Sequence, residues 1–399
     1  MKINPFHHGY QKRVTMGIVA ILGMLLSTQC TAVQNFSANK SRTSRPGNSN
    51  STAITLSWME SYSKHFSNLK QYKVLVYPTL LSASYDNIEN NGTTLPVVNE
   101  DLNMLEATGA SGITIHMGYD PWIINLPNIV SEDTTVCNEI RGDNKTLMLA
   151  DASAEYYRHH KLPWNLFKTV WIKRVTTLAR LCRPAYYTVI KEPPWYVPMI
   201  AGLQRNASNP ADKLVSDPSQ WISLLSQLIS AVKSVSPNTK VGIAVSGDLY
   251  NGSIGGKVDS QILQSAIHLK GLNYIGFDIY TPTAFENTAE FLQKYGSGGK
   301  SIWIAEAWDA TAPTSSINSV NTQTGVAWAQ FLFKFARYIK AVGVVPFYSD
   351  NFASYKTPLS GTSNLLAFYN ERTQLFYEFQ KLISHQKNLE QLFTGAPSP

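Results

Sequence analysis

The strongest constraint on the fold is a regular alternation of strand-like and helix-like segments from residue 54 to residue 385. Short runs rich in β-branched and aromatic residues are typical of buried strands, and the longer amphipathic stretches between them are typical of helices. Eight strand candidates follow one another over about 330 residues, which is the size and order of a (β/α)8 barrel. An open doubly wound sheet is the alternative, but no glycine-rich phosphate loop follows the first strand. The sequence therefore predicts an α/β protein with a (β/α)8 TIM barrel.

The expected strands cover residues 73–77, 113–117, 146–151, a run from 186 that ends in Glu192, 240–245, 274–280, a run from 301 that ends in Glu306, and 344–348. The expected helices cover residues 54–69, 100–108, 128–140, 166–182, 218–235, 259–269, 284–295, 325–341 and 364–385. Asp217 precedes the fifth of these helices and is its expected N-cap.

Two glutamates, Glu192 and Glu306, end the fourth and seventh strand candidates. An unpaired polar group in an apolar strand costs roughly 2 to 7 kcal/mol, and a charge costs more, so a carboxylate at such a place needs an explanation. Taken singly, each could reach solvent or a structural partner. Taken together, they fit the hydrolysis of a glycosidic bond, which needs two carboxyl groups that flank the scissile bond. Trp195 and Trp308 follow the two strands and offer large apolar faces for sugar rings.

With these glutamates on the fourth and seventh strands, residues 70–385 resemble the superfamily of retaining (β/α)8 glycoside hydrolases, the cellulase and β-glycanase type. Glu192 and Pro193 are similar to the Asn-Glu-Pro motif of that family, and residues 302–306 are similar to its nucleophile segment. The resemblance implies that Glu192 is the acid/base and Glu306 the nucleophile. It also implies that Tyr280, at the end of the sixth strand, hydrogen-bonds the nucleophile.

Lys191 departs from the family pattern, because it stands where the family has an asparagine that holds the sugar 2-hydroxyl. A cation beside Glu192 would favour the ionised form of an acid that must hold a proton. Two interpretations stay open. Strand alternation could turn Lys191 away from the site, or the ammonium could make its own contact there, for example with an acidic sugar.

Further substrate contacts are expected where other strands end. His116, Asp151 and Tyr348 end or lie near the ends of the second, third and eighth strands. With Tyr280, Trp308, Trp195 and Lys191 they form the predicted set of substrate-binding residues, although a structural histidine would explain His116 equally well. No spacing of histidines and carboxylates suggests a metal, so no metal and no cofactor are expected.

Residues outside the barrel indicate export. Residues 1–32 combine a positive start, an apolar run of eleven residues and a small polar end, which predicts a signal peptide or, alternatively, an N-terminal membrane anchor, with Cys30 as an alternative lipidation site. Residues 33–53 form a Ser/Thr/Asn-rich linker, residues 54–385 the catalytic domain and residues 386–399 a C-terminal tail. Cys137 and Cys182 either pair or remain buried thiols.

The amino-acid composition limits the classes of molecule that the protein is expected to bind. Charged residues make up 15% of the chain and the net charge is +7, without the dense basic stripe of a nucleic-acid-binding face. The expected partner is a carbohydrate in a secreted or cell-surface setting, with membrane contact only through the N-terminal segment. Nothing in the sequence indicates an oligomeric state. The alternative to a hydrolase is a non-catalytic carbohydrate-binding barrel on the cell surface.

Overall fold

The structure is a computed structural model that describes residues 54–66, 69–84, 95–117, 127–142, 145–151, 164–193, 217–247, 249, 254–307, 323–346, 352–355 and 369–394. The predicted leader and linker, residues 1–53, lie outside the described residues. Among the helices that are described, none is both long enough and apolar enough to cross a membrane.

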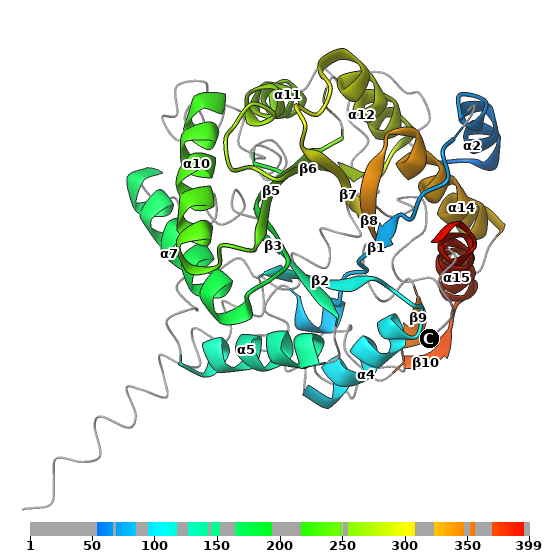
Figure 1. Cartoon of the computed structure of the whole chain (residues 1–399), viewed down its shortest axis with the longest axis horizontal. Helices are drawn as coiled ribbons and strands as arrows, with labels where there is room; N and C mark the ends of the chain where they lie inside the picture. The colour runs from blue at the N-terminus through cyan, green and yellow to red at the C-terminus, as the bar shows by residue number, and fades with distance from the viewer. Residues whose placement is uncertain are drawn as a thin grey trace, which may run out of the picture.

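Eight parallel strands form a ring with the helices outside it (Figure 1). The strands are β1 (Leu75–Val76), β2 (Gly112–Met117), β3 (Thr146–Asp151), β4 (Tyr186–Lys191), β5 (Lys240–Ser246), β6 (Tyr274–Ile279), β7 (Ser301–Ala307) and β8 (Ala341–Pro346). Each strand pairs with the next in sequence from β2 to β8, and β8 pairs with β1. A parallel bridge between Thr79 and Thr114 closes the ring between β1 and β2. The predicted (β/α)8 barrel is thereby confirmed.

The helices that surround the ring follow the predicted order. They are α2 (Leu56–Ser63), α4 (Leu95–Glu106), α5 (Pro127–Gly142), α7 (Trp164–Cys182), α10 (Pro218–Val235), α11 (Ile254–Ala266), α12 (Pro282–Tyr295), α14 (Gln323–Tyr338) and α15 (Gln374–Thr394). Asp217 caps α10 as expected, since its carboxylate accepts a hydrogen bond of 2.9 Å from the backbone N–H of Ser219. Helix α2 lies beside α12 and α14 (Figure 1), where Trp58 packs on Phe285 and Phe331.

The C-terminal region differs from the prediction. The last helix was expected over residues 364–385, but residues 369–372 form strand β10 (Tyr369–Arg372), which pairs antiparallel with β9 (Ala353–Tyr355). Helix α15 then runs from Gln374 to Thr394, so the tail predicted to begin at residue 386 is helical over most of its length. Gln386 is buried and accepts a hydrogen bond of 2.7 Å from the backbone N–H of Val74, which anchors α15 beside the first strand.

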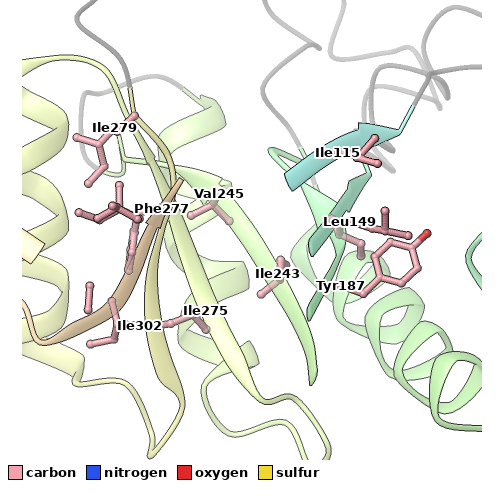
Figure 2. Close-up of a cluster of buried hydrophobic side chains, with 14 of the residues drawn as sticks. Ile115, Leu149, Tyr187, Ile243, Val245, Ile275, Phe277, Ile279 and Ile302 are labelled. Atoms are coloured by element: carbon pink, nitrogen blue, oxygen red, sulfur yellow. The ribbon is translucent and has the colours of Figure 1, made fainter. Parts of the chain in front are cut away.

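The apolar core has two parts, one on each face of the barrel sheet. The larger part lies between strands and helices, and Figure 2 shows side chains such as Leu149, Ile243 and Phe277 in this layer. The smaller part fills the barrel interior near the strand starts, and we call it the aromatic floor. It comprises Tyr77, Tyr186, Tyr274 and Trp303 together with Leu75, Met148, Val342 and Val345.

Rings meet edge to face in the aromatic floor. Trp303 lies 5.2 Å from Tyr77 and 4.9 Å from Tyr186, measured between ring centroids. Gly343 makes room for the indole, because a Cβ at that position would come within 2.5 Å of it. Burial raises the pKa of Tyr77 to about 12, as expected for a phenol shielded from water.

Cys137 and Cys182 form a disulfide, with their Cα atoms 5.2 Å apart. Both cysteines are buried, and the bond ties the middle of α5 to the last residue of α7. Of the two alternatives that the sequence left open, the structure has the paired one.

Candidate active site

Both predicted catalytic glutamates lie at the same end of the barrel. Glu192 directly follows β4, and Glu306 is the penultimate residue of β7. Because all eight strands run parallel, these positions share the carboxyl end of the ring, where (β/α)8 enzymes have their active sites. Each glutamate is 2% exposed, so two carboxyl groups are withdrawn from water here.

A bulge in β7 turns Glu306 toward the barrel axis. Ile304 pairs with Phe277, but the next residue of β6, Asp278, pairs with Glu306, so Ala305 is an extra residue in β7. Ile304 belongs to the outer core, and strict alternation would place Glu306 on that outer face as well. The extra residue reverses the alternation, so Glu306 reaches the interior.

A second bulge, in β4, turns the side chain of Lys191 toward the barrel interior. Thr188 points inward, where its hydroxyl hydrogen-bonds that of Tyr274 at 2.8 Å, so alternation would turn Lys191 outward. The register shifts between Thr188 and Ile190, however, and Lys191 pairs with Ala244. The interpretation that alternation keeps Lys191 out of the site is therefore wrong: its ammonium forms an ion pair with the carboxylate of Glu306.

Lys191 joins three strands across the interior. Besides Glu306 on β7, its ammonium lies 3.9 Å from a carboxylate oxygen of Asp278 on β6. It is also 3.1 Å from the Nδ1 atom of His116 on β2. An ammonium only donates hydrogen bonds, so Nδ1 accepts this one, and a neutral imidazole then has its proton on Nε2. His116 thus lies beside Lys191 in this group of side chains, and its contact with substrate stays a prediction.

Tyr280 also contacts Glu306. Its hydroxyl donates a hydrogen bond to Oε1 of Glu306, and Lys191 contacts Oε2. The expected contact between Tyr280 and the candidate nucleophile is present. Two donors, one of them charged, favour the ionised form of Glu306 and restrict its side-chain orientation.

Glu192 has a different environment. Its φ of 44° lies in the left-handed region, which costs a residue with a Cβ roughly 1 to 3 kcal/mol. The backbone N–H of Glu192 is held by the carbonyl of Ala244 at 2.9 Å. Its Oε1 atom is buried and has no hydrogen-bond partner among the described residues. A strained backbone that carries a buried carboxyl oxygen without a partner is typical of a functional position.

Asp151 does not join this group. It is fully buried and bonds to Arg174 of α7 at 3.0 Å and to the hydroxyl of Tyr187, on the outer face of the sheet. Burial raises the pKa of Asp151, and the Arg174 guanidinium opposes that effect. The expectation that Asp151 contacts substrate is therefore corrected to a structural ion pair between β3 and α7.

Three of the predicted substrate contacts, Trp195, Trp308 and Tyr348, lie outside the described residues.

Asp278 is a site residue that the sequence reasoning missed. The sequence does contain a signal for it. Tyr274, Asp278 and Tyr280 are separated by even numbers of residues, so their side chains lie on the same face of the sixth strand, and a carboxylate on the inner face of a barrel strand is unusual. Over the described part of the chain, no group of three or more His, Cys, Asp or Glu residues is arranged to hold a metal ion.

Comparison with known proteins shows similarity of fold. The sequence matches no protein-family model and no curated protein. Among solved structures, the endo-1,4-beta-D-mannanase of Thermotoga petrophila RKU-1 aligns with a TM-score of 0.51 at 10% identity, over 78% of this chain and 100% of that one. The exo-beta-1,4-mannosidase Op5Man5 of Opitutaceae bacterium strain TAV5 gives 0.53 at 9% identity, over 80% of this chain and 60% of that one. A beta-glucosidase of Thermotoga maritima gives 0.52 at 10% identity, over 79% and 99%. At these identities the similarity establishes the barrel.

Proposed function

We propose that this chain is a retaining glycoside hydrolase that cleaves a β-linked polysaccharide or oligosaccharide by double displacement. The observation that carries the proposal is the pair of buried glutamates at the carboxyl ends of β4 and β7, with Glu306 held by Tyr280 and Lys191. A carboxylate that two neighbouring groups hold in place is suited to attack, and the buried carboxyl of Glu192, whose Oε1 atom has no hydrogen-bond partner among the described residues, is suited to protonate a leaving group.

The proposed reaction has two steps. In the first, an oxygen of Glu306 forms a bond to the anomeric carbon while the bond from that carbon to the glycosidic oxygen breaks, and Glu192 gives its proton to the departing oxygen. In the second, Glu192 takes a proton from water, the water oxygen bonds to the anomeric carbon, and Glu306 leaves as a carboxylate. Both glutamates return to their initial states, and the sugar keeps its anomeric configuration.

The choice of β-linked substrates is supported by the comparisons. The three similar structures are a mannanase, a mannosidase and a glucosidase, each named for a beta linkage, on the same barrel. Retaining hydrolases of this chemistry have their two carboxyl groups about 5 to 5.5 Å apart, and inverting ones about 6.5 to 9.5 Å. A carboxyl separation in the first range, measured in a crystal structure, remains our prediction for Glu192 and Glu306.

A secreted or cell-surface location belongs to the same proposal. Two features support it: the apolar run within residues 1–32, and the disulfide between Cys137 and Cys182, since disulfides persist mainly in oxidising compartments. The carbohydrate substrate would be met outside the cytosol.

The decisive experiment is hydrolysis of a panel of β-linked glycans and aryl β-glycosides by the purified chain. Glu306→Gln should abolish hydrolysis of every substrate, because no intermediate can form. Glu192→Gln should mainly impair natural sugars and spare aryl glycosides, whose leaving groups need little protonation. Azide should rescue Glu192→Ala and give a β-glycosyl azide. Equal loss of aryl-glycoside hydrolysis in both glutamate variants, without azide product, would contradict the assigned roles.

A non-catalytic carbohydrate-binding barrel is the second candidate, and one observation favours it. Oε1 of Glu306 accepts a hydrogen bond from Tyr280 and Oε2 forms an ion pair with Lys191, so the carboxylate is engaged before any sugar arrives. This candidate predicts no turnover by the wild type on any glycan. It also predicts glycan binding that survives Glu192→Gln and Glu306→Gln, measurable by calorimetry.

A further inference from the structure

We propose that Lys191 is a positioning residue that keeps Glu306 ionised in spite of the neighbouring carboxylate of Asp278. The inference rests on the proposed function in naming Glu306 as the nucleophile. It goes further in assigning a task to the residue that departs most from the family pattern.

The need for a cation follows from the register of β6 and β7. Asp278 and Glu306 are paired neighbours across the two strands, and both are almost fully buried. Two carboxylates that share one buried site cannot both ionise easily, and one of them normally retains a proton. A protonated Glu306 would not attack an anomeric carbon.

Lys191 places a positive charge beside these two carboxylates. Its ammonium contacts Glu306 and lies 3.9 Å from Asp278, and its side chain is 6% exposed, so little solvent screens either interaction. His116, which accepts from the same ammonium at 3.1 Å, fixes its place without adding charge. The bulge in β4 is what brings Lys191 into this position.

Within the described parts of the strands, no other cation lies at the end of the barrel where Glu306 lies. Among described residues, β8 has no ionisable side chain, and the only one on β5 is Lys240 at the opposite end of that strand. On the remaining described elements, the ionisable groups that face the centre near Glu306 are His116, Asp278, Tyr280 and Glu192, and the tyrosines of the aromatic floor lie toward the opposite end of the barrel. None of these is a permanent cation. The described part of the barrel thus has a single buried lysine opposed to several carboxyl groups.

Two consequences distinguish this role from a substrate contact. The charge of Lys191 is already matched by Asp278 and Glu306, so the ammonium should not select an acidic sugar. The ionised state of Glu306 should instead persist to lower pH than it would without the lysine, because an opposite charge at this range lowers a carboxyl pKa by about 1 to 3 units.

The test is the pH dependence of kcat/KM for a 2,4-dinitrophenyl β-glycoside, whose first step needs no acid and therefore reports the ionisation of Glu306. In Lys191→Met the acid limb should move up by about 1 to 3 pH units. In Lys191→Met/Asp278→Asn it should return toward the wild-type position, because the repelling carboxylate has also gone. Lys240→Met, at the other end of the barrel, is the matched control and should leave the profile unchanged.

A second readout needs no turnover. With the side-chain carboxyl carbons of glutamate labelled with 13C, the Glu306 signal is assigned by its loss in Glu306→Gln, and its titration is followed by NMR. The titration midpoint should be higher in Lys191→Met than in the wild type. If the wild type hydrolyses nothing and this shift is still seen, the proposed hydrolase fails while the role of Lys191 in ionising Glu306 stands.

Two results would overturn the proposal. One is a uniform fall of kcat/KM in Lys191→Met with the acid limb in place and the NMR titration unchanged, which would make the lysine a packing or substrate-contact residue. The other is a double variant whose acid limb stays as high as that of Lys191→Met, which would show that Asp278 is not the charge that Lys191 offsets.

Discussion

Loss of the disulfide between Cys137 and Cys182 should destabilise the barrel by an amount that the structure allows us to estimate. The two cysteines are 45 residues apart in sequence, and closing a loop of that length in the unfolded chain corresponds to about 4 kcal/mol at 25 °C. A domain of about 340 residues has an unfolding entropy of roughly 0.7 kcal/mol/K, so the same change lowers Tm by about 6 °C.

The assay is urea unfolding of the oxidised protein, followed by far-UV circular dichroism, for Cys137→Ala, Cys182→Ala and the double variant. Each single substitution breaks the same bond. Each should therefore cost nearly as much as the double substitution, so the three losses should be similar rather than additive. Titration of thiols in denaturant should find one thiol in the full chain, that of Cys30, because the other two cysteines are paired.

Additive losses from the two single variants would refute the reasoning, because they would show two independently packed thiols. Three titratable thiols in the oxidised protein would refute it directly. Reduction provides an independent check, since a reductant should lower the stability of the wild type and leave the double alanine variant unaffected.

Three further predictions follow from packing, buried charge and domain limits. Gly343→Ala should lower the free energy of unfolding by about 1 to 3 kcal/mol in urea, because its Cβ would lie 2.5 Å from the Trp303 ring; unchanged stability would contradict the packing of the floor. Arg174→Met should cost about 3 to 5 kcal/mol at pH 7 by leaving Asp151 as an unpaired buried charge. Burial raises the pKa of Asp151, so the folded state binds its proton more readily than the unfolded state, and the cost should shrink as pH falls toward 4. A penalty independent of pH would contradict that account. A chain that begins at Ser51 should keep the cooperative melting of the full chain, and loss of that transition would place residues 33–50 in the core.

The order of the barrel elements could be predicted from sequence because the signals are local. The third strand was predicted with the bounds that the structure has, and α10 with its cap, since apolar runs and an Asp-Pro start are visible in the sequence. The short hairpin of β9 and β10 was missed, because strands of three and four residues have too few positions to show a period.

It was harder to predict whether the side chain of a site residue points to the inner or the outer face of its strand. Asp151 lies in a strand whose register is regular. Met148 is on the inner face, and side chains alternate between faces, so Asp151, three residues later, lies on the outer face. The expectation of a substrate contact for Asp151 could therefore have been rejected. Lys191 and Glu306 follow bulges, which reverse the count. A bulge depends on how two strands pair, and a single strand sequence does not contain that information.

The aromatic floor limits the direction from which a ligand can reach the centre of the barrel. Trp303 and its neighbouring rings fill the barrel interior near the amino ends of the strands, and Trp303 is three residues before Glu306 on the same strand. Within the described part of the barrel, this floor fills the interior on the far side of Glu306, so a molecule that reaches Glu306 is expected to come from the carboxyl ends of the strands. If the chain is the glycoside hydrolase that we propose, its product must leave by the end that admits the substrate, so the product should act as a competitive inhibitor of hydrolysis.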